Sequence, residues 1–321
     1  NKIVREMIYA KQVCDAADGT DDCVIKPSEI AALSAAVGYD TRSGEAILDG
    51  LVGMERVRAR IEEILAQVEY ACAHGMEQPT LHMRFVGNPG TGKTTVARAL
   101  GKLFAARGVL RKGAFFECAA RELCGKYVGQ TAPRTAEICR EAYGSVLFID
   151  EAYALYKGER DGDTFGKEAL DTLTAEMENH RGDFVVIMAG YPDEMQTLLE
   201  ANPGLESRMP YVVEFPNYDR AALCAIFMRF CEKATVTDDL AAAVRAYFDA
   251  LPDAVLAAEN FSNARFVRNL FERTCGKATM RARLAGAETV VLSKEDFRAA
   301  GSDREFAALM EKKPKRMGFG I

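Results

Sequence analysis

Residues 87–94 read Gly-Asn-Pro-Gly-Thr-Gly-Lys-Thr, a complete G-x-x-x-x-G-K-T sequence. The run just before it, Leu81-His-Met-Arg-Phe-Val86, is typical of a buried strand. The run after it, Lys93–Phe104, has apolar residues at the spacing of a helix. A strand, a glycine-rich turn and a helix in this order form the context of a phosphate-binding loop. The alternative, a glycine-rich turn that matches by chance, does not account for both flanking elements.

The chemistry of a triphosphate explains these residue types. Its dense negative charge needs many backbone N–H groups that converge without side chains in the way, and glycines permit that. Lys93 is expected to neutralise the β- and γ-phosphates at the start of the helix, and the Thr94 hydroxyl to bind Mg²⁺. The residues expected to hold ATP in this loop are Asn88, Pro89, Gly90, Thr91, Gly92, Lys93, Thr94 and Thr95.

A second nucleotide motif is Val146-Leu-Phe-Ile-Asp-Glu151. Its four apolar residues predict a central strand, which places Asp150 at the strand end, across from Thr94, as a second Mg²⁺ ligand. Glu151 is then positioned as the general base that polarises the attacking water. Alone, an Asp-Glu pair after an apolar strand is also typical of a solvated strand end. The phosphate-binding loop upstream favours the catalytic interpretation.

Composition sets the class of protein. The 321 residues give room for about two domains, and 49% hydrophobic residues can build a sizeable core. The net charge of −6 argues against nucleic acid as the partner, because binders of a phosphate backbone carry a basic face. Nine cysteines without a C-x-x-C pair suit reduced thiols in the cytoplasm. We expect no membrane span and no signal peptide, and the first residue, Asn1, suggests a sequence that begins inside a longer chain or after processing.

The pattern along the chain predicts three parts: an N-terminal helical segment at 1–45, an α/β nucleotide-binding domain at 46–217, and an α-helical lid domain with a C-terminal tail at 218–321. Strands that alternate with helices imply a parallel five-stranded sheet with helices on both faces. After the fifth strand the chain reads as helical. The predicted strands are Arg84–Gly87, Ala114–Cys118, Ser145–Asp150, Asp183–Ala189 and Tyr211–Phe215.

The two ends of the chain carry weaker signals. Positions 1, 3, 5 and 12 of a calcium-loop template fall on Asp18, Thr20, Asp22 and Glu29, but Cys23 occupies the sixth position, which needs glycine. We therefore favour an acidic helix–helix turn over a calcium site. The charged run 311–316 is interpreted as a solvated tail.

Several longer strings resemble one group of AAA+ P-loop ATPases, the group that contains red-type rubisco activase and stage V sporulation protein K. They are Thr80–Thr94, Tyr127–Thr135, Gly144–Leu155 and Ala189–Tyr191, and the resemblance covers about residues 47–300. It implies a P-loop NTPase fold with a helical lid, ATP hydrolysis with Mg²⁺, and assembly into a ring.

The resemblance also implies roles for three arginines. Asn202–Arg208 resembles the segment that ends in an arginine finger, which would place Arg208 against the γ-phosphate of a neighbouring subunit. The alternative is that Arg208 caps a helix and pairs with Glu206. The string Ser262-Asn-Ala-Arg265 resembles the second sensor, so Arg265 would reach the phosphates of its own subunit. Arg268 is the fallback candidate.

Two further stretches follow from the same resemblance. Leu51, Val52 and Gly53 resemble the adenine-contacting stretch, which needs apolar surface and free backbone groups. At the end of the fourth strand most AAA+ proteins carry a polar residue that positions water, whereas this chain has Tyr191. The role of first sensor is therefore not transferred to Tyr191.

The segment Lys126-Tyr-Val-Gly129 indicates the kind of molecule on which the energy of ATP hydrolysis acts. In ring-forming threading ATPases an aromatic and an aliphatic residue before a glycine project into the central channel and grip a polypeptide by apolar contact. Tyr127, Val128 and Gly129 are the candidates, the alternative being that Tyr127 packs in the core. A finger that acts in trans also implies a closed head-to-tail ring, a hexamer by resemblance.

The leading hypothesis is an ATP-driven remodeller of a protein client, with rubisco as one specific candidate. A nucleic-acid motor or loader is the first alternative, and it would need a basic or aromatic channel. A nucleotide-gated scaffold with little turnover is the second, and the intact Asp150, Glu151 and Arg208 speak against it. The segment 1–45 weakly resembles a tellurite-resistance-type helical module, which suggests recruitment of a different partner.

Overall fold

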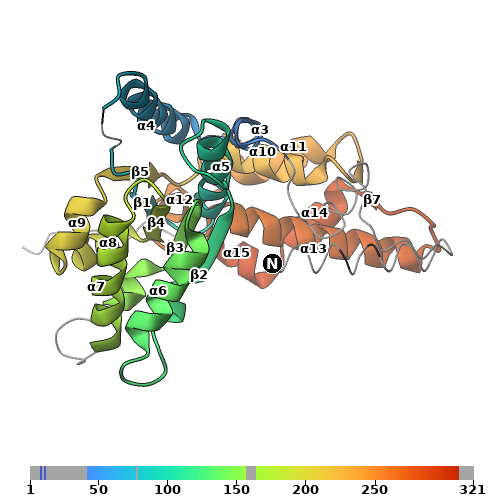
Figure 1. The fold of residues 1–321 in the computed structure, drawn as a ribbon. Coiled ribbons are helices and arrows are strands. Elements are labelled where there is room, and N and C mark those ends of the chain that lie inside the picture. Colours follow the sequence, from blue (N-terminus) through green and yellow to red (C-terminus); the bar gives the residue numbers. More distant parts are fainter. Residues whose placement is uncertain (1–7, 9–10, 12–41, 77–78, 157–163, 311–321) are drawn as a thin grey trace, which may run out of the picture.

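The computed structural model of the chain describes residues 8, 11, 42–76, 79–156 and 164–310. The turn around Asp18, the calcium-loop positions and the charged run 311–316 lie outside the described residues, so the predictions made for them stay predictions. Figure 1 shows an α/β part followed along the chain by a helical part. Among the described residues, no helix is both long and apolar enough to cross a membrane.

A five-stranded parallel sheet forms the centre of the α/β part. Its strands are β1 (Met83–Gly87), β2 (Phe115–Ala119), β3 (Val146–Asp150), β4 (Val185–Gly190) and β5 (Tyr211–Phe215). Their order in the sheet is β2-β3-β4-β1-β5, and every pair is parallel. The predicted sheet is confirmed, with strand ends within two residues of the expected ones.

Helices cover both faces of this sheet because strands β3 and β4 are apolar on both of their faces, at Val146–Ile149 and Val185–Ala189. On β3, Val146 and Phe148 face one core and Leu147 and Ile149 face the other. Figure 1 shows the two helical layers on opposite sides of the sheet. The first layer consists of α3 (Gly44–Asp49), α4 (Glu55–Ala73) and α5 (Lys93–Ala106). The second consists of α6 (Thr131–Ala142), α7 (Thr164–Asn179), α8 (Pro192–Glu200) and α9 (Pro203–Arg208).

One buried histidine joins the sheet to the second layer. The Val186 N–H donates to His82 Nδ1 at 3.0 Å, and His82 Nε2 lies 3.5 Å from the Met177 carbonyl oxygen at the end of α7. Burial lowers the pKa of His82 to about 4, so the ring is neutral at physiological pH. His82 is therefore part of the scaffold and does not face the site described below.

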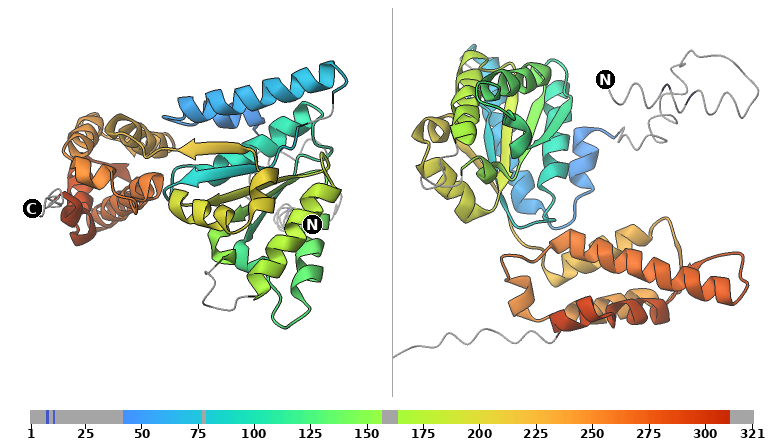
Figure 2. Two further views of the ribbon diagram at one scale, coloured as in Figure 1. Left: turned by 90° about the vertical axis from the view of Figure 1, so that its left-hand side faces the viewer. Right: turned by 90° about the horizontal axis from the view of Figure 1, so that it is seen from below.

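The helical part follows β5 and forms its own layer beside the sheet (Figure 2). Its aromatic side chains, such as Phe227 and Phe248, pack in the interior. It also contains a two-residue parallel pair, β6 (Thr235–Val236) with β7 (Val291–Leu292), which the sequence analysis does not predict. We propose a domain boundary at about residue 218. The helices are α10 (Arg220–Cys231), α11 (Leu240–Asp249), α12 (Asp253–Leu256), α13 (Asn263–Leu284), α14 (Lys294–Gly301) and α15 (Arg304–Met310).

Candidate functional site

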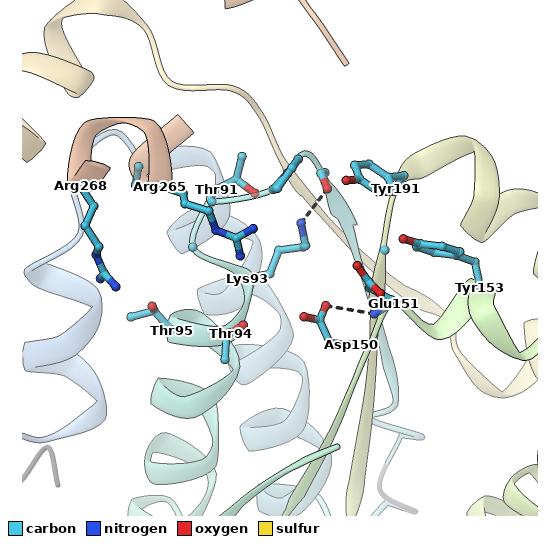
Figure 3. Close-up of a pocket in the computed structure, with 16 residues that line it drawn as sticks. Thr91, Lys93, Thr94, Thr95, Asp150, Glu151, Tyr153, Tyr191, Arg265 and Arg268 are labelled. Atoms are coloured by element: carbon cyan, nitrogen blue, oxygen red, sulfur yellow. Dashed lines mark hydrogen bonds between the residues drawn. The ribbon is translucent and has the colours of Figure 1, made fainter. Parts of the chain in front are cut away.

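A cavity of ≈ 420 Å³ opens at the carboxyl ends of β1, β3 and β4, where the start of α13 approaches the sheet. Such crevices at strand ends are where open parallel sheets bind ligands. Figure 3 shows side chains from the loop after β1, the end of β3 and α13 converging on this space. The residues that line it are Gly87, Pro89, Gly90, Thr91, Gly92, Lys93, Thr94, Thr95, Asp150, Glu151, Tyr153, Gly190, Tyr191, Ala264, Arg265 and Arg268.

The loop after β1 turns sharply at two glycines before α5 begins. Gly90 and Gly92 have φ values of 70° and 93°, the left-handed region in which a side chain is strained. Gly90 also lies against the helical part, since a Cβ there would stand 2.2 Å from the Ser262 carbonyl oxygen. These two positions therefore require glycine for conformation, and Gly90 requires it for space as well.

Lys93 is the first residue of α5 and its ammonium group points back across the loop. Its Nζ donates to the Gly87 carbonyl at 2.6 Å and to the Asn88 carbonyl at 2.8 Å. Burial lowers the pKa of Lys93 to about 8, against the opposing effect of Asp150, and Arg265 lowers it further. A cation that is poorly solvated in this way gains strongly from a nearby anion.

Asp150 ends β3 and Glu151 follows it in an uncommon backbone conformation. Glu151 has φ 50° and ψ 43°, a left-handed geometry that only a few per cent of non-glycine residues adopt. Its N–H donates to Asp150 Oδ1 at 3.0 Å, which fixes the carboxylate of Asp150 (Figure 3). Strained residues of this kind concentrate at functional sites.

The remaining walls come from α13 and from two tyrosines. In Figure 3 the Arg265 guanidinium lies on the Lys93 side of the cavity, whereas the Arg268 side chain points away from Lys93 toward Thr95. The rings of Tyr153 and Tyr191 are 5.8 Å apart and close the opposite side, near Glu151.

Tyr153 was missed by the sequence analysis as a site residue, although it stands two positions after Glu151 in the motif. Gly190 makes room for its ring, because a Cβ at Gly190 would stand 2.8 Å from Tyr153 Cδ1. Burial raises the pKa of Tyr153 to about 12, and the charge of Glu151 adds to this effect. The hydroxyl therefore stays protonated at neutral pH.

Four residues predicted to contact the nucleotide do not line this cavity. Asn88 Nδ2 donates to Asn217 Oδ1 at 2.9 Å, so this amide side chain is directed into a contact with the segment after β5. Leu51, Val52 and Gly53 lie beside the start of the helical part, where a Cβ at Gly53 would stand 3.1 Å from Ala222 Cβ. Their adenine-contacting role stays a prediction.

Comparison with known proteins gives this architecture a family. Residues 83–217 match the ATPase family associated with various cellular activities (AAA), and residues 219–307 match the AAA lid domain. Protein CfxQ of Xanthobacter flavus is 40% identical over 272 residues, which span 78% of this chain and 82% of that protein. The chain belongs to the AAA ATPase family.

Two other relatives of this AAA ATPase fall in the red-type group that the motifs resemble. Stage V sporulation protein K of Bacillus subtilis is 40% identical over 242 residues, 73% of this chain and 74% of that protein. The chloroplastic ribulose bisphosphate carboxylase/oxygenase activase of Cyanidioschyzon merolae is 40% identical over 239 residues, 72% of this chain and 76% of that protein. Binding and hydrolysis of ATP follow from membership of this family.

Arg208, the predicted arginine finger, does not line the cavity of this AAA ATPase. Arg208 ends α9, where its Nε donates to Glu178 Oε2 at 3.0 Å and its guanidinium also donates to the Gly204 carbonyl. It thus contacts its own helix, as the alternative supposed, but its ion pair is with Glu178 and not with Glu206, which approaches Arg84 at 4.0 Å.

The segment after β2 is exposed in this AAA ATPase. Tyr127 is 71% exposed and Val128 is 89% exposed, so the alternative in which Tyr127 packs in the core is wrong for this structure. Gly129 has φ 83° and a Cβ there would meet nothing within 4 Å. Two neighbouring apolar side chains therefore stand in solvent at the tip of this segment.

Magnesium chemistry would fit the donors of this cavity. Among the described residues, no cluster of three or more His, Cys, Asp or Glu side chains could hold a metal by itself. Mg²⁺ usually binds one or two protein oxygens together with substrate phosphates and water. The hydroxyl of Thr94 and the carboxylate of Asp150, which both line the cavity, are the protein oxygens that suit it.

Proposed function

We propose that this AAA ATPase is one subunit of a ring, with six members by resemblance, that hydrolyses Mg²⁺-bound ATP to remodel a protein client in its central channel. One observation carries the proposal: the predicted residues divide into two sets. Lys93, Asp150, Glu151 and Arg265 share one cavity, whereas Arg208 and the segment Tyr127–Gly129 lie on the surface outside it.

Within the cavity, the proposed roles follow from charge and position. Lys93 neutralises the β- and γ-phosphates, Thr94 and Asp150 hold Mg²⁺, and Glu151 polarises the attacking water. Arg265 reaches the phosphates from the lid domain and makes the lid angle depend on the nucleotide. The magnesium ion, when bound, withdraws charge from the phosphoryl group that is transferred.

For Arg208 we propose a role across a subunit interface. It does not line the cavity of its own chain, and its contact with Glu178 keeps the guanidinium at the surface, where both side chains are partly exposed. A head-to-tail contact, repeated around an axis, would bring Arg208 of one subunit to Lys93 of the next and close a ring. Arg208 would then offset the charge that develops on the γ-phosphate.

For the exposed segment we propose contact with a polypeptide in the channel. Tyr127 and Val128 offer apolar surface without charge, which grips many sequences through non-directional contact. One relative is named as an activase of ribulose bisphosphate carboxylase/oxygenase. We therefore propose that enzyme as the first client to test. Nucleic acid and membranes are not proposed as partners.

The experiment uses Glu151→Gln, which should bind ATP without hydrolysing it and so hold the client. Captured protein would be compared between Glu151→Gln alone and Glu151→Gln combined with Tyr127→Ala. Tyr70→Ala is the matched control, because Tyr70 is 60% exposed on α4, close to the 71% of Tyr127. We expect Tyr127→Ala, and not Tyr70→Ala, to abolish ATP-dependent capture. Equal capture by all three proteins would refute the role of the exposed segment.

A further inference from the structure

The lid domain is joined to the phosphate-binding loop by a cluster of three asparagine side chains, the buried Asn263 and the half-buried Asn88 and Asn217. We propose that Asn263 is a positioning residue for ATP binding: it fixes the start of α13, and with it Arg265, relative to the loop Gly87–Thr94. This inference rests on ATP binding at that loop and does not depend on a ring or on a protein client.

Asn263 begins α13 and has the features of a residue held for its side chain. It is fully buried, and its φ of 47° is left-handed, a conformation that asparagine tolerates better than most residues. Its Oδ1 accepts from the Tyr218 N–H at 2.9 Å. Its Nδ2 group donates to Phe261 O at 2.8 Å and Asn217 Oδ1 at 2.9 Å, and Pro89 O lies 3.3 Å away.

Asn217 is the centre of this cluster. Its Oδ1 accepts from both Asn88 Nδ2 and Asn263 Nδ2, each at 2.9 Å, while its own Nδ2 donates to the Leu256 carbonyl at 2.8 Å. One side chain in the connection between β5 and α10 thus joins the phosphate-binding loop to the lid domain. Every amide group of Asn263 and Asn217 has a partner, which is the condition under which a buried polar cluster stabilises one arrangement over others.

A backbone hydrogen bond makes the same connection next to Asn263. The Ala264 N–H donates to the Gly90 carbonyl at 3.1 Å, at the glycine whose missing side chain lets α13 approach. The first turn of α13 is therefore tied to the loop at Pro89, at Gly90 and, through Asn217, at Asn88. Arg265 is one residue further along, so these contacts also fix the point from which its side chain enters the cavity. A lid that swings away must break them or pull the loop with it.

The test measures the dissociation constant of a fluorescent ATP analogue for the whole chain. Asn263→Gly permits the same left-handed backbone and removes the side chain, so its hydrogen bonds are lost without added backbone strain. Asn263→Asp keeps the shape and the acceptor for the Tyr218 N–H, but removes both donors. Thr274→Ala is the control: Thr274 is a fully buried residue of the same helix, and its hydroxyl donates within α13, to the Leu270 carbonyl.

We expect Asn263→Gly to raise the dissociation constant about tenfold, which corresponds to the net loss of one or two hydrogen bonds. Asn263→Asp should be at least as weak, and Thr274→Ala should stay within about twofold of the unmodified chain. In the Arg265→Ala background, Asn263→Gly should add less than about twofold, because both changes remove the same contact with the phosphates.

Asn217→Ala is a second variant for the same test, and it changes no residue of α13. It removes the shared acceptor and should weaken binding as Asn263→Gly does, with the folded state of each variant verified by thermal unfolding. The proposal is overturned if Asn263→Gly and Asn217→Ala bind the analogue as tightly as the unmodified chain. It is equally overturned if the effects of Asn263→Gly and Arg265→Ala add in full, since Asn263 would then not act through Arg265.

Discussion

At the scale of single residues, the cavity combines one cation that is poorly solvated with one carboxylate on a strained backbone. Lys93 is held against two carbonyl oxygens of its own loop, and Glu151 has a left-handed backbone at the end of β3. Both features raise the free energy of the folded chain, and binding of a phosphate group offsets this increase. The sequence motif identifies these residues, but not the conformations that prepare them.

The lowered pKa of Lys93 predicts a proton linked to ATP binding. With a pKa of about 8, roughly half of the Lys93 side chains are neutral at pH 8 in the absence of ATP. The phosphates favour the charged form, so binding should take up a proton, and affinity should fall as the pH rises above about 8. Calorimetry in two buffers of different ionisation enthalpy should show uptake increasing from about pH 7 to about pH 8.5. An uptake that does not change over this range would contradict the burial of Lys93.

At the scale of elements, the sheet was predictable and the contacts between domains were not. Val146–Ile149 of β3 and Val185–Ala189 of β4 are continuous apolar runs, which is what a sheet covered on both faces requires. β6 and β7 have two residues each and leave no periodic pattern. Asn263 was inside a recognised motif, yet its role depends on Asn217 and Asn88, which only the fold brings next to it.

Two helix glycines give a matched prediction at this scale. Gly166 lies in α7, and a Cβ there would stand 2.0 Å from the Leu155 carbonyl oxygen, in the short helix that follows Glu151. Gly276 lies in α13 with nothing within 4 Å of such a Cβ. Gly276→Ala should raise the free energy of unfolding by about 0.5–1 kcal/mol through helix propensity.

Gly166→Ala should instead lower the free energy of unfolding, because α7 must move away from Leu155. Denaturant unfolding of the two variants provides the measurement, read as the change in midpoint at constant slope. If Gly166→Ala is as stable as Gly276→Ala, the packing of α7 against the segment after Glu151 is not as tight as the structure has it.

At the scale of the whole molecule, the chain is an AAA domain with a lid, and the arrangement of its predicted residues suggests an incomplete site. Most of the residues expected to bind the nucleotide line the cavity, whereas Arg208 and Tyr127 lie outside it. The family resemblance supplied this division of roles before the structure, because both residues are within recognised motifs. Composition and periodicity could not have predicted this division of roles, because a contact between subunits produces no periodic pattern in the sequence of a single subunit.

The most direct test of the central claim, a site completed by a neighbour, is a mixture of two inactive variants. Lys93→Ala lacks a working cavity but keeps Arg208, and Arg208→Ala should bind ATP but lack the finger. Each alone should hydrolyse almost no ATP. When the two are mixed in equal amounts, about a quarter of the interfaces in a ring pair an intact cavity with an intact Arg208. We predict that the mixture regains a matching fraction of the ATPase activity. A mixture as inactive as its two components, or an Arg208→Ala protein with full turnover by itself, would contradict the account.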